Sequence, residues 1–283
     1  MEKKTALVTG VSGVVGHALV TYLLENEWEV AGVNRSGIMP WRVFNHKGLT
    51  LHRVDLREYK STIDFIRKIQ PTAVFNLAGC NDNKVPKTGP MEIINSNLIT
   101  ALNILESVRL YSPNAKVVMP SSVESSYSKK FNLPLTPYRF SKISIESLVQ
   151  CYYQSYGIYC TVLQLTNIYG PADRNTKRLI PQCINRLMRN YPVEVFSDLL
   201  TERDYLYSYD AATAFVTAIN DIEANAGKIF AVKSGFMVSI GEIIKCLENM
   251  SKSNGEISYD LKMSNAGEAE YPQLPNWKPE WKM

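Results

Sequence analysis

Short apolar runs alternate with longer segments of helical periodicity along the first half of the chain. Each run has the length and the almost continuous apolar character of a strand buried in a parallel sheet. The runs occupy residues 6–8, 29–33, 49–54, 73–79 and 116–119. Between them, apolar residues recur every three or four positions, which predicts helices at residues 14–23, 59–69 and 91–110. This alternation predicts an α/β fold with a doubly wound parallel sheet, whose ligands bind at the carboxyl ends of the strands.

The first predicted strand leads into a glycine-rich turn in which Gly10, Gly13 and Gly16 recur every three residues. In such a turn Gly10 permits the tight bend, Gly13 lets the backbone approach a pyrophosphate, and Gly16 lets the helix pack closely on the strand. The following helix N-terminus favours an anion. We therefore expect a dinucleotide cofactor at this turn, with Ser12 and Val14 among its contacts.

The end of the second predicted strand carries Asn34, Arg35 and Ser36, where a fold of this kind contacts the adenosine ribose. A carboxylate there would accept hydrogen bonds from the 2′-hydroxyl of NAD, whereas arginine and serine favour a 2′-phosphate. We expect NADP(H) as the preferred cofactor, with NAD(H) as the second choice. Arg35 is also compatible with a solvated surface charge that has no role in binding.

Two further strand ends supply candidates for cofactor binding. After the third strand, Asp55 is placed to accept the adenine amino group and Leu56 to pack on the ring, although Asp55 also suits the N-cap of the next helix. The fourth strand ends in Leu77, Ala78 and Gly79, and the small residues among them leave room for a cofactor across the strand ends.

Tyr138 and Lys142 are four residues apart in a segment that begins with Pro137 and has an apolar stripe. On a helix this spacing places both side chains on one face, where the ammonium lowers the pKa of the phenol and prepares it for acid and base chemistry. Ser122 follows the fifth strand, from where its hydroxyl reaches a substrate carbonyl beside Tyr138. The alternatives are a chance Tyr-x-x-x-Lys on an amphipathic helix and a serine that satisfies loop backbone.

Composition narrows the function classes. The chain has 283 residues and a net charge of +4, with scattered basic residues, which argues against a nucleic-acid partner. Its five cysteines are far apart and lack histidines at ligand spacing, so we expect reduced thiols, a cytoplasmic protein and no metal site. Polar residues and glycines interrupt the apolar segment 6–24, and no signal peptide is expected, so neither a membrane span nor export is predicted.

The motifs taken together resemble the extended short-chain dehydrogenase/reductases, in particular the NAD(P)-dependent epimerase/dehydratase family that acts on nucleotide sugars. The resemblance covers nearly the whole chain and rests on residues 9–16, 55–56, 76–78, 121–122, 167–171, 180–181 and 203–207, with Asn97, Tyr138 and Lys142. It implies that Ser122, Tyr138 and Lys142 form the catalytic triad. It also implies that Asn97 belongs to the cofactor site.

The same resemblance implies a Rossmann domain with a smaller carboxyl-terminal substrate-binding domain. We expect the Rossmann domain at residues 1–168 with 203–224, and the smaller domain at residues 169–202 with 225–283. The substrate residues that the resemblance implies are Ser122, Glu124, Asn167, Arg178 and Arg203. A homodimer is expected through the two long helices, at residues 91–110 and 137–150.

Within the family, the chain is most similar to reductases of nucleotide-linked 4-keto-6-deoxy sugars, such as GDP-6-deoxy-D-mannose reductase. Dehydratases of the family place an acid or polar residue directly after the catalytic serine, where this chain has Val123. Fucose-synthase-type enzymes place a cysteine where this chain has Glu124. The expected activity is reduction of the sugar C4 ketone by NADPH. The alternatives are a C4 epimerase or 4,6-dehydratase that retains its cofactor, and a non-catalytic NADP(H)-binding regulator.

Overall fold

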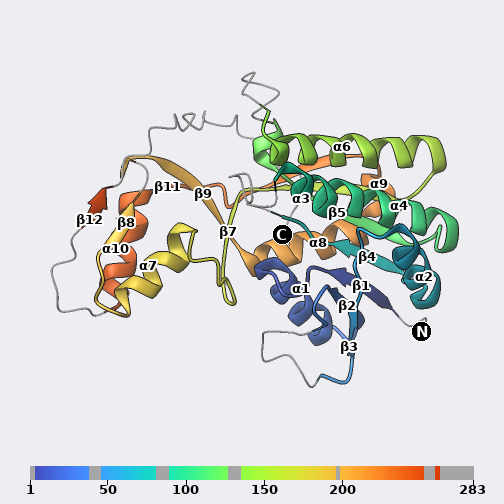
Figure 1. Cartoon of the computed structure of the whole chain (residues 1–283), viewed down its shortest axis with the longest axis horizontal. Helices are drawn as coiled ribbons and strands as arrows, with labels where there is room; N and C mark the ends of the chain where they lie inside the picture. The colour runs from blue at the N-terminus through green and yellow to red at the C-terminus, as the bar shows by residue number, and fades with distance from the viewer. Residues whose placement is uncertain are drawn as a thin grey trace.

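A seven-stranded parallel sheet, in the order β10-β6-β5-β4-β1-β2-β3, forms the centre of the protein in a computed structural model (Figure 1). The structure describes residues 4–37, 46–80, 89–126, 135–195, 198–251 and 259–261. The strands are β1 (Thr5–Thr9), β2 (Glu29–Asn34), β3 (Leu49–Arg53), β4 (Ala73–Asn76), β5 (Lys116–Ser122), β6 (Cys160–Leu165) and β10 (Ile229–Val232). The strand order reverses between β1 and β4, which confirms the doubly wound α/β fold.

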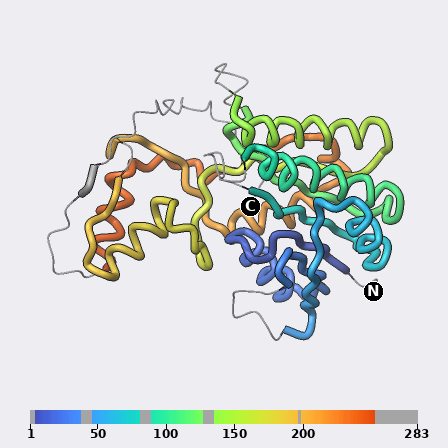
Figure 2. The backbone as a smooth tube through the Cα atoms, viewed as in Figure 1, coloured from blue at the N-terminus to red at the C-terminus, as the bar shows by residue number. Residues whose placement is uncertain are grey.

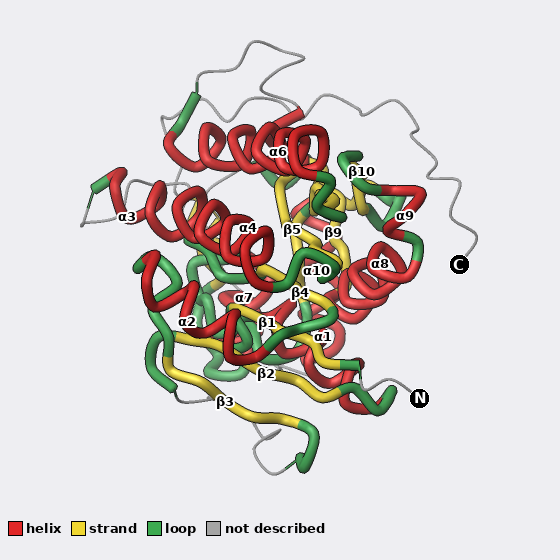
Figure 3. The backbone as a smooth tube through the Cα atoms, turned by 90° about the vertical axis from the view of Figure 1, so that its right-hand side faces the viewer, coloured by secondary structure: helices red, strands yellow, loops and turns green. Residues whose placement is uncertain are grey.

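Helices cover both faces of this sheet, and a separate apolar core fills each interface (Figure 3). On one face α1 (Val14–Glu25) packs against α8 (Ser208–Asn220). On the other face lie α2 (Tyr59–Ile69), α4 (Thr100–Tyr111) and α6 (Pro137–Tyr156). Because both faces are covered, the strands are apolar on both sides, and this is why they are visible in the sequence as continuous runs.

The helix expected at residues 91–110 consists of three consecutive segments. It begins with α3 (Pro90–Ile94), continues through the π-helical turn η1 (Asn95–Ile99) and ends with α4. π-Helical turns inside α-helices are rare, and those that occur are often found at functional sites. Here it contains Asn97, which is only 1% exposed.

A smaller lobe extends to one side of the main sheet (Figure 2). Its three-stranded sheet has the order β11-β9-β7, and a two-stranded sheet pairs β12 with β8. These elements are β7 (Asn167–Tyr169), β8 (Val193–Val195), β9 (Glu202–Tyr207), β11 (Met237–Ser239) and β12 (Tyr259–Leu261), with helices α7 (Leu179–Leu187) and α10 (Ile240–Ser251). Its core contains Cys183, Leu187, Val193 and Ile244, all buried.

The boundary between the two parts differs from the expected division in two places. The apolar strand β10 follows the short helix α9 (Ile222–Asn225) and pairs in parallel with β6, so it belongs to the main sheet and not to the smaller domain assigned to residues 225–283. In the opposite sense, β9 pairs with β7 and β11, although residues 203–207 were assigned to the Rossmann domain. Within the described residues, no helix is long and apolar enough to cross a bilayer.

Candidate active site

The glycine-rich turn after β1 requires glycine at two positions because of close backbone approach. Gly10 has φ +64°, and a Cβ there would lie 2.5 Å from the carbonyl oxygen of Leu77. A Cβ on Gly16 would lie 2.3 Å from the oxygen of Gly10, so a side chain would push α1 away from β1. Gly13 is the N-cap of α1, and Val14 is the first helical residue. The backbone cradle that a dinucleotide pyrophosphate needs is therefore present.

A cavity of about 420 Å³ opens beside this turn, at the carboxyl ends of β2, β3 and β4. Its lining includes the predicted cofactor residues Gly10, Ser12, Asn34, Arg35, Ser36, Asp55, Leu56 and Ala78. Ser96 and Thr100, from η1 and α4, also line the cavity and were not predicted from the sequence. The volume is in the range of small-molecule sites, and the location is the switch point where the strand order reverses. We refer to it as the cofactor cavity.

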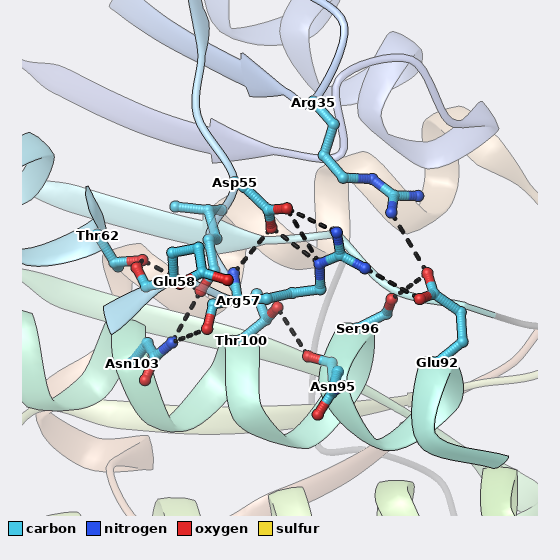
Figure 4. Close-up of polar contacts among 11 residues, drawn as sticks. Arg35, Asp55, Arg57, Glu58, Thr62, Glu92, Asn95, Ser96, Thr100 and Asn103 are labelled. Atoms are coloured by element: carbon cyan, nitrogen blue, oxygen red, sulfur yellow. Dashed lines mark hydrogen bonds and ion pairs between the residues drawn. The ribbon is translucent and has the colours of Figure 1, made fainter. Parts of the chain in front are cut away.

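Four charged side chains meet beside the cofactor cavity, and we call them the four-charge cluster: Arg35, Asp55 and Arg57, which line the cavity, and Glu92, which pairs with both arginines (Figure 4). Arg57 donates from Nη2 to Asp55 Oδ2 at 2.6 Å and from Nη1 to Glu92 Oε2 at 2.9 Å. Arg57 holds the pKa of Asp55 below its usual value through this hydrogen bonding. Arg57 and Glu92 were not predicted from the sequence, because they are 35 positions apart and meet only in the folded chain.

The N-cap role considered for Asp55 is wrong. Helix α2 has Glu58 as its N-cap residue, without a side-chain capping bond. Asp55 instead accepts from the backbone N–H of Arg57 at 3.1 Å and from the guanidinium of the same residue. Its carboxylate is therefore engaged in fixing Arg57.

The predicted catalytic residues lie together at the carboxyl end of β5. Ser122 ends that strand, and its hydroxyl acts on Tyr138 as a hydrogen-bonding group that lowers the pKa of the phenol. Lys142 follows one turn later in α6, with Nζ 5.7 Å from the centroid of the Tyr138 ring. Helix α6 begins sharply because Thr136 accepts the N–H of Arg139 at 3.2 Å and Pro137 occupies the first turn. The beginning of α6 thus presents Tyr138 to the end of β5.

The prediction that Lys142 lowers the pKa of Tyr138 is wrong in this arrangement. Burial raises the pKa of Tyr138 to about 12, the charge of Glu124 adds to the rise, and the hydrogen bond with Ser122 opposes it. Burial also lowers the pKa of Lys142 to about 8. The ammonium lies over the ring and donates to the carbonyl of Pro120 at 3.3 Å. At neutral pH this geometry gives a protonated phenol beside a charged lysine.

Asn97 connects the end of β4 to helix α6. Its Nδ2 donates to the carbonyl of Cys80 at 3.0 Å and to Ser141 Oγ at 2.9 Å, while its Oδ1 accepts from the N–H of Cys80 at 2.7 Å. Ser141 in turn donates to the carbonyl of Tyr138 at 2.7 Å. Asn97 was predicted as a cofactor residue, and in the structure its amide positions the segments on both sides of the site.

A buried carboxylate that was not predicted from the sequence acts on Lys142 of the triad. Glu146 is 1% exposed and lies one turn after Lys142 in α6. Its Oε1 accepts from Ser121 Oγ at 2.7 Å and from Gln164 Nε2 at 2.8 Å, and Ser125 is a further donor. The charge of Glu146 raises the pKa of Lys142 and so opposes the effect of burial. The continued spacing of four residues from Tyr138 to Lys142 to Glu146 is the signal that could have found it.

Two of the predicted substrate residues, Glu124 and Arg178, act on Tyr138 through their charges. Glu124 forms an ion pair with Arg139 at 3.2 Å, and the negative charge of Glu124 raises the pKa of Tyr138. The positive charge of Arg178 lowers the pKa of Tyr138, although this arginine is also paired with Asp173 at 3.1 Å.

The other two predicted substrate residues belong to the smaller lobe. Asn167 on β7 donates to the carbonyl of Asp204 at 3.3 Å. Arg203 on β9 donates to the carbonyl of Glu202 at 3.0 Å. Neither residue is among those that shift the pKa of Tyr138. In the described ranges no group of histidines, cysteines and carboxylates has the arrangement of a metal site.

Comparison with known proteins agrees with the fold. The UDP-glucuronate 4-epimerase of Thermodesulfobacterium geofontis is 25% identical, over 97% of this chain and 91% of the relative. The GDP-L-fucose synthase of Dictyostelium discoideum is 27% identical, over 93% of this chain and 85% of the relative. The crystal structure of UDP-glucose 4-epimerase from Thermotoga maritima, with UDP-glucose, has a TM-score of 0.81 at 22% identity, over 92% of this chain and 87% of that one.

The family itself follows from a match that includes every strand of the main sheet. A family model described as the NAD dependent epimerase/dehydratase family matches residues 6–232, from β1 to β10. The cradle at Gly10 and Gly16 and the cavity at the switch point fit a nicotinamide dinucleotide in the way that such a family requires. The chain belongs to the NAD-dependent epimerase/dehydratase family.

Proposed function

We propose that the protein reduces the C4 ketone of a nucleoside-diphosphate-4-keto-6-deoxyhexose, with NADPH as the reductant. The observation that carries this proposal is the meeting of Ser122, Tyr138 and Lys142 at the carboxyl end of β5, where Tyr138 is the available proton donor. A reduction needs a proton donor at the start of the reaction, and a phenol whose pKa is about 12 holds its proton at neutral pH. An oxidation would first need the phenolate, which burial disfavours.

Each member of the triad has a distinct role in this reaction. Ser122 holds the ketone oxygen, and Tyr138 donates the proton that this oxygen needs as it becomes an alcohol. Lys142, charged at neutral pH, binds the nicotinamide ribose and so positions the cofactor beside Tyr138. The bound nicotinamide cofactor supplies the hydride.

The residues after Ser122 favour reduction over dehydration. Val123 is 6% exposed and has no proton to offer a leaving hydroxyl group. Glu124 is held by Arg139 in an ion pair in which both side chains are largely buried. Neither side chain is therefore available as a second acid. We assign binding of the nucleotide diphosphate to Asn167, Arg178 and Arg203. Asn167 and Arg203 lie on strands of the smaller lobe, and Arg178 is close enough to Tyr138 for its charge to lower the pKa of the phenol.

A C4 epimerase with a retained cofactor is the second candidate function. It is favoured by the 25% identity to UDP-glucuronate 4-epimerase over nearly the whole chain. The position of Arg35 in the cofactor cavity supports NADP(H) and therefore the reductase, since the 2′-phosphate would meet a guanidinium there.

The test is loss of NADPH absorbance when the purified protein is mixed with GDP-, CDP- and dTDP-4-keto-6-deoxyhexoses in turn. We expect loss of NADPH matched by formation of the deoxyhexose for one nucleotide. Tyr138→Phe should reduce turnover by about 10²–10⁴-fold, the usual contribution of general acid catalysis. Tyr153→Phe, on the exposed side of the same helix, is the matched control and should retain full turnover.

Two outcomes would contradict this proposal. If no sugar in the panel consumes NADPH, and UDP-sugars are interconverted at C4 without net change in the cofactor, the protein is an epimerase. If Tyr138→Phe turns over as fast as Tyr153→Phe, the triad assignment is wrong.

A further inference from the structure

The four-charge cluster has the form of an anion site that the protein fills with its own carboxylate. Glu92 spans two guanidinium groups, with Oε1 3.3 Å from Arg35 Nη1 and Oε2 2.9 Å from Arg57 Nη1 (Figure 4). Ser96 Oγ donates a further hydrogen bond to Glu92 Oε1 at 3.0 Å. One acceptor group therefore receives hydrogen bonds from three side chains, which come from the segment after β2, from η1 and from the segment after β3.

Asp55 fixes the direction of the Arg57 guanidinium. Arg57 Nε lies 2.9 Å from Asp55 Oδ1, and Nη2 lies 2.6 Å from Oδ2. A guanidinium is planar and rigid, so these two contacts determine where Nη1 points, and it points to Glu92. Arg57 lines the cofactor cavity and its side chain is 30% exposed, while the side chain of its partner Glu92 is 25% exposed.

A phosphate monoester matches this arrangement better than a carboxylate does. It carries about −1.5 to −2 charges and three acceptor oxygens, and arginine clusters bind such groups through charge-assisted hydrogen bonds. The cluster has two cations and two carboxylates, so it has no net charge while Glu92 is in place. The negative charge of Glu92 would repel a phosphate bound to the two arginines. Phosphate binding therefore favours a conformation in which Glu92 no longer contacts the arginines.

We propose that Arg57 is the second guanidinium, beside Arg35, that binds the 2′-phosphate of NADP(H), and that Glu92 occupies this site in the free protein and is displaced by the phosphate. The proposal rests on the proposed cofactor preference and names residues that set its strength. NAD(H) has a neutral 2′-hydroxyl at this position. This hydroxyl can donate a hydrogen bond to the Glu92 carboxylate, so Glu92 does not have to move. Arg57 thus increases selectivity for NADP(H), and Glu92 decreases it.

The experiment is calorimetric binding of 2′,5′-ADP, NADP⁺ and NAD⁺ to the full-length protein and its variants. The 2′,5′-ADP probe carries the 2′-phosphate without the nicotinamide. Glu92→Gln should tighten 2′,5′-ADP and NADP⁺ about tenfold, because the competing charge is removed, and should not tighten NAD⁺. Arg57→Met should weaken 2′,5′-ADP and NADP⁺ about tenfold or more and should change NAD⁺ little.

Matched controls separate this site from general electrostatics. Glu58→Gln removes a charge that also acts on Arg57 but does not pair with it, and should leave the ratio of NADP⁺ to NAD⁺ affinity unchanged. Arg67→Met removes an arginine that pairs with Asp64 on the surface of α2, and should also leave the ratio unchanged. Thermal unfolding of each variant shows whether it is folded.

Failure of this inference is distinct from failure of the proposed function. If Glu92→Gln binds 2′,5′-ADP no more tightly than the unchanged protein, the inference is overturned, whatever Arg57→Met does. If NADP⁺ is preferred and only Arg35→Met removes the preference, the inference is overturned and the cofactor preference stands. If the unchanged protein prefers NAD⁺, the cofactor preference is overturned, while a gain of NADP⁺ affinity in Glu92→Gln still supports the anion site.

Discussion

At the scale of single residues, the proposed chemistry depends on the protonation of Tyr138 and Lys142. The pKa of Lys142 is about 8, so its charge is present at neutral pH and is lost as the pH rises through that value. The pKa of Tyr138 is about 12, so the phenol keeps its proton over the same range. We expect kcat to fall above pH 8 because Lys142 becomes neutral, and a profile of kcat against pH with the best sugar substrate measures this.

The stability of the fold has the opposite pH dependence in this range, which provides the control. The unfolded chain keeps the Lys142 proton up to its ordinary pKa of 10.5, whereas the folded protein releases it near 8. Between these values the unfolded state binds more protons, so this residue makes the free energy of unfolding rise with pH. A thermal midpoint that falls together with kcat above pH 8 would contradict the assignment, because unfolding would then explain the loss.

At the scale of elements, helix α6 presents Tyr138, Lys142 and Glu146 on successive turns toward the end of β5. Glu146 anchors the helix through hydrogen bonds from Ser121 on β5 and Gln164 on β6. Glu146→Ala should lower the free energy of unfolding by about 1–3 kcal/mol, because buried donors lose their acceptor. Denaturant unfolding measures the change.

Two further variants on the same helix sharpen this prediction. Gln150→Ala removes an exposed polar side chain from α6 and should change stability by less than about 0.5 kcal/mol. Glu146→Gln keeps an acceptor oxygen but removes the charge that raises the pKa of Lys142, so the fall of kcat should move to lower pH. An unchanged pH profile in Glu146→Gln would mean that Glu146 has a purely structural role.

At the scale of the whole molecule, the sequence predicted what is encoded locally. The five apolar runs became β1 to β5, because strands buried on both faces must be apolar along their whole length. The roles of Gly10 and Gly16 were predictable because backbone contact excludes any side chain there.

Features that depend on tertiary contact were not predictable from the same patterns. The partner of Arg57 is Glu92, and nothing in the chain between them indicates the pairing. The pKa of Tyr138 was predicted in the wrong direction because helical spacing places Lys142 nearby but says nothing about burial. The return of β10 to the main sheet was missed because a four-residue apolar strand is compatible with either part of the fold.

The assembly expected from the sequence is a homodimer through α4 and α6, which lie side by side on one face of the sheet (Figure 3). These helices expose Leu102, Leu110 and Tyr153, which are 37%, 42% and 38% accessible. Leu102→Glu should raise the dimer dissociation constant by about tenfold or more, because a charge would be buried in an apolar contact. Sedimentation velocity over a range of concentrations measures this.

Met188→Glu is the control for this prediction, since Met188 is 79% exposed and follows α7 on the smaller lobe. It adds the same charge far from α4 and α6 and should leave the dimer intact. Equal dissociation of both variants would indicate a general effect of charge. An unchanged protein that sediments as a monomer at every concentration would exclude the dimer, and the exposed residues of α4 and α6 would then be ordinary solvent-facing apolar side chains.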